Sequence, residues 1–201
     1  MKNLLLLLLA APFILSYNNS NQNSKANQKK DTLAYKTHIT TMNTQKITPC
    51  LWVEKDAKAV ADYYLSIFQD GKLKEYHHYE NTPEAVAISG QETFEIAIIQ
   101  IAEMEFQILA AGPFFKFNES ISFVINCKDQ AEVDYYWEAL TSNGGAEGQC
   151  GWCKDKYGLS WQVVPVEYYE LISNEGPSVR AKVMKNTMRQ KKIILSELKQ
   201  S

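Results

Sequence analysis

The chain has 201 residues, a formal net charge of -2 and 45% hydrophobic residues. This length and composition suit one globular domain with additional segments. The small negative charge argues against the basic stripe that nucleic-acid binders carry, so no nucleic-acid partner is predicted.

The first residues have the layout of a secretory signal peptide. Lys2 precedes an apolar run from Leu4 to Leu15, and the small residue Ser16 follows. About twelve apolar residues are too few to span a bilayer, so we predict a signal peptide over 1–16. The protein is then exported, periplasmic or secreted, and it touches a membrane only through this leader if the leader stays uncleaved. The alternatives are a buried N-terminal helix and a cytoplasmic protein.

A polar segment follows the apolar run. It begins with YNNSNQNSKANQKKDT, which has no large aliphatic side chain and cannot bury enough surface to order itself. We predict a disordered spacer over 17–45, a folded domain over 46–168 and a C-terminal helical extension over 169–201.

Two segments of the chain repeat at a distance of 73 residues. Glu54–Gly71 aligns with Cys127–Gly144, and both contain Lys-Asp near the start and Gly at the end. Apolar residues recur in each at three- and four-residue steps, which predicts two amphipathic helices. Asp129 and Glu132 match a capping box, and Gly144 suits the left-handed conformation that ends a helix.

Strand-like runs flank each predicted helix. Ile47–Val53 precedes the first helix and Ser120–Asn126 precedes the second. The first helix is followed by KLKEYHHY, EAVAIS, FEIAIIQI and EFQILAA, with a hairpin turn at 102–104, and the second by AEGQCGW and LSWQVVP. The modules would span 46–112 and 118–166. Two such units, each with one open sheet face, would close a shared cavity, so the repeat predicts a pocket.

A resemblance to a known family rests on ITPCLWVEKDAKAVADYYLSIF and on GPFFKFNESISFVINCKDQAEVDYYWEALTSNGGAEGQCGWCKDKYGLSWQVVP. These stretches closely resemble the PhnB-like branch of the vicinal oxygen chelate superfamily of glyoxalases and bleomycin resistance proteins. The resemblance, from about Ile47 to Leu198, implies an α+β fold of paired βαβββ modules with a C-terminal helix, usually dimeric. The branch is often labelled 3-demethylubiquinone 3-methyltransferase-like, but this sequence lacks the Gly-rich loop after a strand that S-adenosylmethionine would favour.

The resemblance also implies where a metal would sit, because enzymes of the superfamily hold a divalent ion with His, Gln and Glu. Gln107 and Gln162 stand at the acidic positions. The histidine positions fall at uncharged residues, near Pro49 or Cys50 and near Ser120 or Ser122. A neutral amide binds a divalent ion weakly, so we predict no metal and no other cofactor, with a divalent metal as the alternative.

The three histidines do not supply the missing ligands. His38 precedes the first strand of the repeat. His77 and His78 are neighbours and would point to opposite faces of a strand. We expect them to be partly exposed strand residues.

Cys150 and Cys153 have the spacing of thiol–disulfide oxidoreductases. A thioredoxin-type pair begins a helix whose dipole lowers the thiol pKa, whereas the residues here predict strand, turn and strand. In an extended chain the two Cα atoms would lie about 10 Å apart, beyond the roughly 7 Å that a disulfide bridges. We expect unlinked thiols, with a disulfide across a turn at 151–152 or a metal or redox site as alternatives. Asp155 and Gly158 are expected to form a turn.

Two further groups have both a structural and a functional interpretation. Lys116, Asn118 and Glu119 lie on the bridge between modules and would cap the cavity mouth, make a dimer contact or form a solvated linker. Trp52 and Trp161 lie on predicted strands and are more often core residues than ligand-stacking ones.

These observations predict a small-molecule-binding protein, a homodimer whose cavity holds an apolar or aromatic ligand. The candidate ligand-binding residues are Trp52, Gln107, Ser122, Cys150, Trp161 and Gln162. The alternative is a metal-dependent lyase, isomerase or dioxygenase with an unusual ligand set, for which we assign no catalytic residue. A third interpretation is an exported interaction protein whose dimer face is the functional surface.

Overall fold

The computed structural model describes residues 45–200. The predicted signal peptide, nearly all of the predicted spacer and His38 therefore lie outside the described residues. Between residues 45 and 200, no helix is long and apolar enough to cross a membrane.

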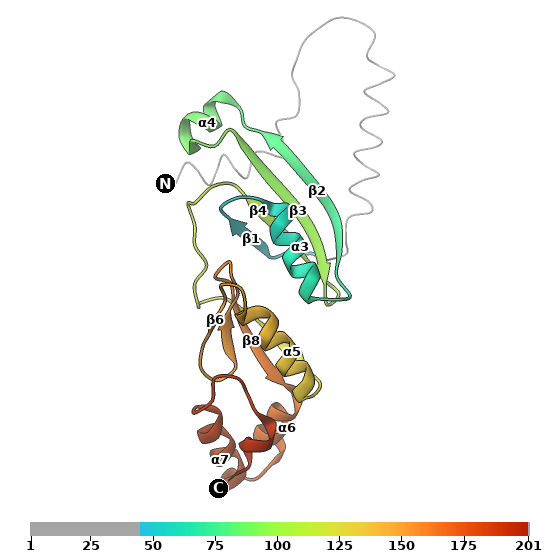
Figure 1. Cartoon of the computed structure of the whole chain (residues 1–201), viewed down its shortest axis with the longest axis vertical. Coiled ribbons are helices and arrows are strands. Elements are labelled where there is room, and N and C mark those ends of the chain that lie inside the picture. The colour runs from blue at the N-terminus through green and yellow to red at the C-terminus, as the bar shows by residue number, and fades with distance from the viewer. Residues whose placement is uncertain (1–44, 201) are drawn as a thin grey trace, which may run out of the picture.

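The first module is a four-stranded sheet with one helix packed on it. Strand β1 (Cys50–Val53) leads to helix α3 (Ala57–Ile67), which is followed by β2 (Lys72–Glu80), β3 (Thr93–Ile101) and β4 (Met104–Ala110). The strands lie in the order β1-β4-β3-β2, and β1 runs parallel to β4 while the other pairs are antiparallel (Figure 1). We call this sheet A.

The second module repeats the same plan as sheet B. Strand β5 (Ser122–Cys127) leads to helix α5 (Gln130–Thr141), and β6 (Ala146–Glu147), β7 (Trp152–Lys154) and β8 (Ser160–Pro165) follow. The order is β5-β8-β7-β6, and β5 is parallel to β8. The two modules thus share their strand order, which confirms the predicted α+β fold of paired βαβββ modules.

Equivalent residues of the two helices are buried on their sheets, as the repeat predicted. Each of the following is at most 4% exposed: Val60 and Val133, Tyr64 and Trp137, Ile67 and Leu140. The predicted cap of α5 is also present, since Asp129 Oδ1 accepts from the Glu132 amide at 2.9 Å. The Glu132 carboxylate in turn accepts from the amide of Lys128 at 2.7 Å, one residue before the usual partner of a capping box.

One predicted strand is a helix. The run EAVAIS was expected to be extended, but Pro83–Ser89 forms α4 between β2 and β3. The helix forms because its first turn is well capped. Thr82 Oγ1 accepts from the Ala85 amide at 3.3 Å, and Pro83 stands in the first turn, where proline is favoured. Gly90 ends the helix in the left-handed conformation, with φ 68°.

Residues with positive φ mark two turns between strands, of which the sequence predicted one. The predicted turn after β3 is confirmed, because Ala102 and Glu103 both have positive φ. The run AEGQCGW is not one strand but two, with a turn between β6 and β7. Cys150 (φ 58°) and Gly151 (φ 82°) take left-handed conformations there, outside the extended region of a regular strand.

Three helices form the C-terminal extension. They are α6 (Val166–Asn174), α7 (Pro177–Thr187) and α8 (Leu195–Leu198), and α6 begins directly after β8, earlier than the predicted boundary. The extension has a small core of its own on the end of sheet B, made of Val164, Leu171, Val183, Ile193 and Leu198.

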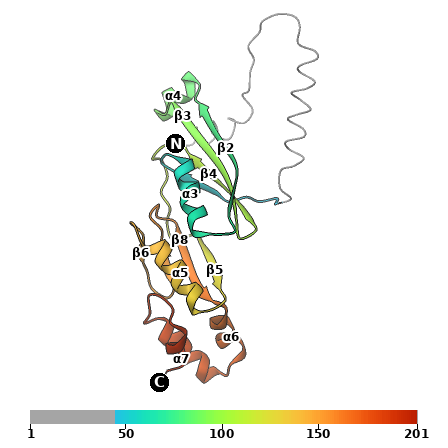
Figure 2. The same ribbon diagram turned by 45° about the vertical axis from the view of Figure 1, so that its right-hand side comes forward.

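The two modules lie end to end in an elongated molecule. Helices α3 and α5 contact each other on the same side of the two sheets, as the views of Figures 1 and 2 show. The buried sides of the modules merge there, where the Trp161 ring lies 6.0 Å from Tyr64 and 5.5 Å from Phe68 between ring centroids. Phe106 and Phe123 form a second contact, at 5.0 Å.

Candidate functional site

Each sheet has a covered face and an open face. Every second residue of β3 and β4 is buried against α3: Ala97, Ile99, Ile101, Phe106, Ile108 and Ala110. The residues between them are only half-buried and point the other way, including Ile96, Ile98, Gln107 and Leu109. We call this side the open face of sheet A. Predicted site residues lie on it and on its counterpart in sheet B.

Gln107 lies on the open face of sheet A beside Cys50. The two residues are neighbours in the parallel pairing of β4 with β1, and Gln107 Nε2 donates to Cys50 Sγ at 3.6 Å. Burial raises the pKa of the Cys50 thiol above its usual value, and the hydrogen bond from Gln107 offsets this only in part. The pair is therefore an uncharged amide and an uncharged thiol.

Gln162 holds the equivalent place on sheet B. Its Nε2 donates to Ser122 Oγ at 2.9 Å, so both predicted residues share one face. Ser160 pairs with Ser122 on one side and Lys154 on the other, and its hydroxyl is buried without a hydrogen-bond partner among the described residues. No pattern in the sequence pointed to Ser160 beyond its position two residues before Gln162.

Trp52 joins the open face of sheet A to the bridge between the modules. Its indole Nε1 donates to the Gly112 carbonyl at 2.8 Å. The rings of Phe114 and Phe115 pack edge-to-face with the indole, with centroid distances of 6.3 and 4.8 Å. These rings remain partly exposed and form an aromatic cluster at the end of β1.

The other two candidates lie elsewhere. Trp161 is 3% exposed and points to the covered face of sheet B, which fits the core interpretation and not direct contact with a ligand on the open face. Cys150 lies in the turn before β7, where its amide donates to the Gln190 carbonyl of the C-terminal extension at 2.8 Å. Four of the six candidates thus lie on an open face, two on each sheet.

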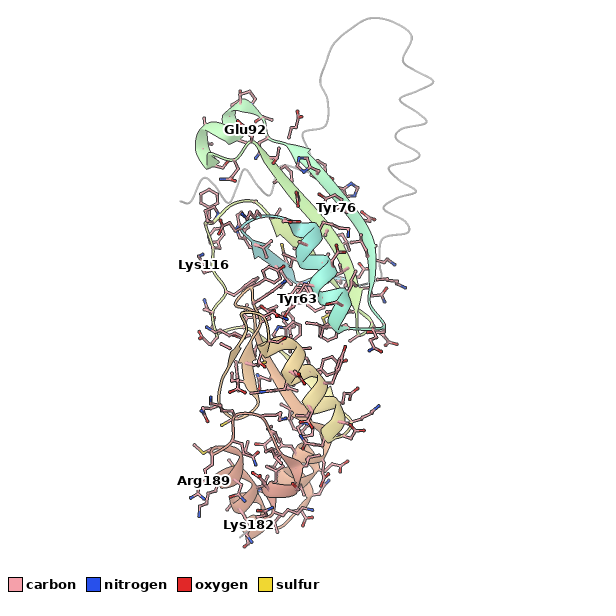
Figure 3. All side chains as sticks on the ribbon, viewed as in Figure 1. Tyr63, Tyr76, Glu92, Lys116, Lys182 and Arg189 are labelled. Atoms are coloured by element: carbon pink, nitrogen blue, oxygen red, sulfur yellow. The ribbon has the colours of Figure 1, made fainter. Side chains whose placement is uncertain are left out.

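Asp155 has a second role that the sequence did not reveal. It forms the predicted turn by accepting from the amides of Tyr157 and Leu159, at 2.9 and 3.1 Å. The same buried carboxylate also accepts from the Tyr64 hydroxyl and from Trp161 Nε1, both at 2.9 Å. Burial raises the pKa of Asp155, and its four hydrogen bonds offset this in part. The contact joins α3 of the first module to the second, at the junction where Figure 3 labels the neighbouring Tyr63.

The Cys150/Cys153 pair lacks the features of a redox site. Both cysteines are free, as predicted. Cys153 is buried, and this burial together with the nearby Asp155 raises the pKa of its thiol to about 12. A thiol with such a pKa is protonated at neutral pH and is a poor nucleophile.

His77 and His78 lie on β2 and are partly exposed, as predicted. His77 Nε2 is 3.2 Å from Glu75 Oε2, and His78 Nδ1 is 3.5 Å from Glu95 Oε1, with both rings about half exposed. Across residues 45–200, no cluster of three or more His, Cys, Asp or Glu is placed to hold an ion.

The side chains at the family's metal positions do not fit a divalent ion either. The amides of Gln107 and Gln162 point their nitrogens at a thiol and a hydroxyl, and neither has a carboxylate as its hydrogen-bond partner. Such neutral ligands bind a divalent ion weakly.

One hollow in the described part of the chain is on the helical side. It is a shallow groove of about 490 Å³ between the end of α3 and the start of α5, lined by residues that include Ile67, Asp70, Glu132 and Tyr135. Neither candidate glutamine lines it. The two open faces lie away from the helices, so within one chain they do not face each other across the expected shared cavity. The contacts of Trp161 with α3 hold the modules in this end-to-end arrangement.

The fold of two βαβββ modules with the same strand order defines a protein of the glyoxalase type. The family model described as 3-demethylubiquinone-9 3-methyltransferase matches residues 45–164, so the chain belongs to this family. No match is found among curated proteins.

The chain is also similar to several solved structures. A putative 3-demethylubiquinone-9 3-methyltransferase, a PhnB protein from Bacillus cereus, is 25% identical with a TM-score of 0.51, over 60% of this chain and 99% of that one. A protein from Pseudomonas aeruginosa is 18% identical with a TM-score of 0.48, over 61% of this chain and 98% of that one. A glyoxalase family protein from Bacillus cereus is 14% identical with a TM-score of 0.39, over 62% and 98%.

Proposed function

We propose that the protein binds a small apolar or aromatic molecule on the open faces of its sheets, without the divalent metal of the superfamily's enzymes. The observation that carries this proposal is the chemistry of the open face of sheet A. Half-buried Ile96, Ile98 and Leu109 surround the neutral Gln107–Cys50 pair, with Trp52 at one end. An apolar surface with few polar groups is the usual lining of a ligand site.

A second copy of the chain would complete the pocket. The open faces of one chain point away from its helices, and each is too exposed to enclose a ligand alone. Val124, next to Gln162 on sheet B, is 43% exposed. If the open face of sheet A in one copy covers that of sheet B in another, both glutamines line one enclosed cavity. Each copy in the proposed homodimer thus contributes half of each site.

Native mass spectrometry of the full chain purified from its own host tests this proposal. We expect a dimer that carries a small organic molecule and no metal. A stoichiometric divalent ion that stays bound through dialysis would contradict the proposal and favour a metal-dependent enzyme. A dimer with neither ligand nor metal would favour an interaction protein.

A binding assay with a matched pair of variants locates the site. The fluorescent dye anilinonaphthalene sulfonate serves as an aromatic probe. Ile98→Ser places a hydroxyl on the open face of sheet A, and we expect it to weaken dye binding about tenfold, because burying an unpartnered hydroxyl costs about 1–3 kcal/mol. Ile88→Ser is the control, because Ile88 is 48% exposed on α4. Equal losses in both variants would place the dye elsewhere.

A further inference from the structure

Charge is distributed very unevenly along the chain. Residues 45–175 contain 21 acidic and 9 basic side chains, whereas residues 176–200 contain one acidic side chain, Glu197. The seven basic residues of this last segment are Arg180, Lys182, Lys185, Arg189, Lys191, Lys192 and Lys199. A positively charged end therefore follows an acidic body.

Most of these positive charges have no acidic partner within the described residues. Lys191 pairs with Glu147 at 3.0 Å and Lys192 pairs with Asp134 at 2.6 Å, which ties the segment to sheet B and α5. The other five basic residues form no ion pair in residues 45–200. Five cations on one short segment thus form no ion pair that would stabilise the fold.

Helix α7 arranges part of this charge around exposed methionines. Val183 belongs to the small core of the extension, and Thr187, one turn later on the same side, is also buried. The opposite side has Met184, which is 51% exposed, and Met188, directly after the helix, which is 72% exposed. Arg180 lies one turn before Met184 on this side.

Lys185 and Arg189 continue the same surface and are exposed. We call the five residues Arg180, Met184, Lys185, Met188 and Arg189 the α7 stripe.

The stripe lies far from the proposed ligand site. Figure 3 labels Arg189 and Lys182 at the end of the molecule opposite the first module. The acidic residues before and after the stripe in the sequence are Glu167, Glu170 and Glu175, in α6 and the turn after it, and Glu197 in α8, and none of them forms an ion pair with the stripe. Because surface charges are screened over about 8 Å in physiological salt, the acidic first module would repel an anionic partner at this end only weakly.

We propose that the α7 stripe binds the surface of a membrane that contains anionic lipids. The basic side chains would contact lipid phosphates, and the two methionines would enter the boundary between headgroups and acyl chains. A lipid surface fits better than a nucleic acid for two reasons. A nucleic acid offers no apolar layer for the methionines, and the stripe has no aromatic ring to stack on bases.

Co-sedimentation of the full chain with lipid vesicles tests the proposal. The vesicles contain either phosphatidylcholine alone or phosphatidylcholine with one third phosphatidylglycerol, each at low and at high salt. We expect stronger binding to the anionic vesicles, reduced by salt. Any insertion of the apolar N-terminal run would add to binding on both lipids, so the difference between the two vesicle types is the quantity that reports on the stripe.

Three variants identify the residues responsible. Neutralising the stripe with Arg180→Gln, Lys185→Gln and Arg189→Gln together should remove at least tenfold of the preference for anionic vesicles, since each cation near such a surface strengthens binding about fivefold. Met184→Ser with Met188→Ser should weaken binding severalfold but keep its salt dependence. The matched control neutralises Lys46, Lys55 and Lys72, three exposed lysines of the first module that form no ion pair with another residue of 45–200.

Three outcomes would overturn the proposal. One is equal loss of anionic preference in the stripe and control variants. Another is equal binding to both vesicle types by the unaltered protein. The third is binding of a DNA oligonucleotide that depends on the three basic residues but not on the methionines, which would assign the stripe to nucleic acid. Circular dichroism of each variant shows that the fold is unchanged.

Discussion

At the scale of single residues, Asp155 shows how one side chain holds the two modules together. Its carboxylate accepts from two amides of its own turn and from Tyr64 and Trp161. A buried carboxylate is costly by itself, and these four donors compensate for the lost water. Asp155 therefore matters more for the junction between modules than for the turn in which it lies.

Asp155→Ala should strongly destabilise the protein. The variant leaves the Tyr64 hydroxyl and the Trp161 indole buried without an acceptor, so we expect a loss of about 3 kcal/mol in the free energy of unfolding. Urea denaturation followed by tryptophan fluorescence measures it. Asp62→Ala is the control, because the exposed Asp62 forms a surface ion pair with Lys58, and its loss should stay below about 0.5 kcal/mol. A small effect at Asp155 would show that the modules do not depend on this contact.

The same residue gives the stability of the protein a dependence on pH. Burial raises the pKa of Asp155 in the folded protein above its ordinary value of 3.8. The folded state then holds the proton more tightly than the unfolded chain, so this carboxyl's contribution is fully present below about pH 4 and is lost as pH rises through the folded pKa. The advantage of the natural protein over Asp155→Asn should therefore shrink as pH rises from 4 to 7. Urea unfolding at several pH values tests this, and an advantage that grows with pH would contradict it.

At the scale of elements, the sequence could predict helices better than the links between them. Helices α3 and α5 were predictable because their apolar residues repeat at helical spacing and because Asp129 caps the start of the second one, although α5 ends at Thr141, before the predicted Gly144. Helix α4 was not, since it has no buried residue and only its caps define it. The division of AEGQCGW into two strands depends on the left-handed backbone at Cys150 and Gly151. The pattern of residues there did not predict this backbone conformation.

Gly145 and Gly90 lie in links that follow helices, and replacing each by alanine should have different effects because the space around the new Cβ differs. A Cβ on Gly145 would lie 2.0 Å from the Leu140 carbonyl oxygen and 2.8 Å from that of Lys154, so α5 and β7 would have to separate. A Cβ on Gly90 would meet nothing within 4 Å, and only its φ of 68° is unfavourable. We expect Gly90→Ala to cost about 1 kcal/mol and Gly145→Ala about 3 kcal/mol or more in the free energy of unfolding. Thermal melting compares them, and equal costs would show that the close approach relaxes easily.

At the scale of the whole molecule, the sequence predicted the modules but not their arrangement. The repeat and the family resemblance indicated two βαβββ units, and the shared strand order confirms them. Whether the open sheet faces meet within one chain depends on how the modules pack, and this is decided by contacts between distant residues such as Tyr64 and Asp155. Four candidate site residues could be placed from their strand positions. Ser160 could not, because its unpartnered hydroxyl becomes apparent only once β8 is paired on both sides.

The end-to-end arrangement leads to a prediction about assembly. If two copies pair their open faces, the protein in solution should have about twice the 22.9 kDa mass of one chain, which sedimentation equilibrium measures. Val124→Lys places a charge on the open face of sheet B, where desolvating an unpaired ammonium on association is costly. We expect this variant to be a monomer and to lose its bound molecule. Val166→Lys changes a residue of similar exposure, 41% against 43%, at the start of α6, and should remain a dimer. A dimer that withstands Val124→Lys but not Val166→Lys would place the interface on the C-terminal extension and leave each open face without a partner.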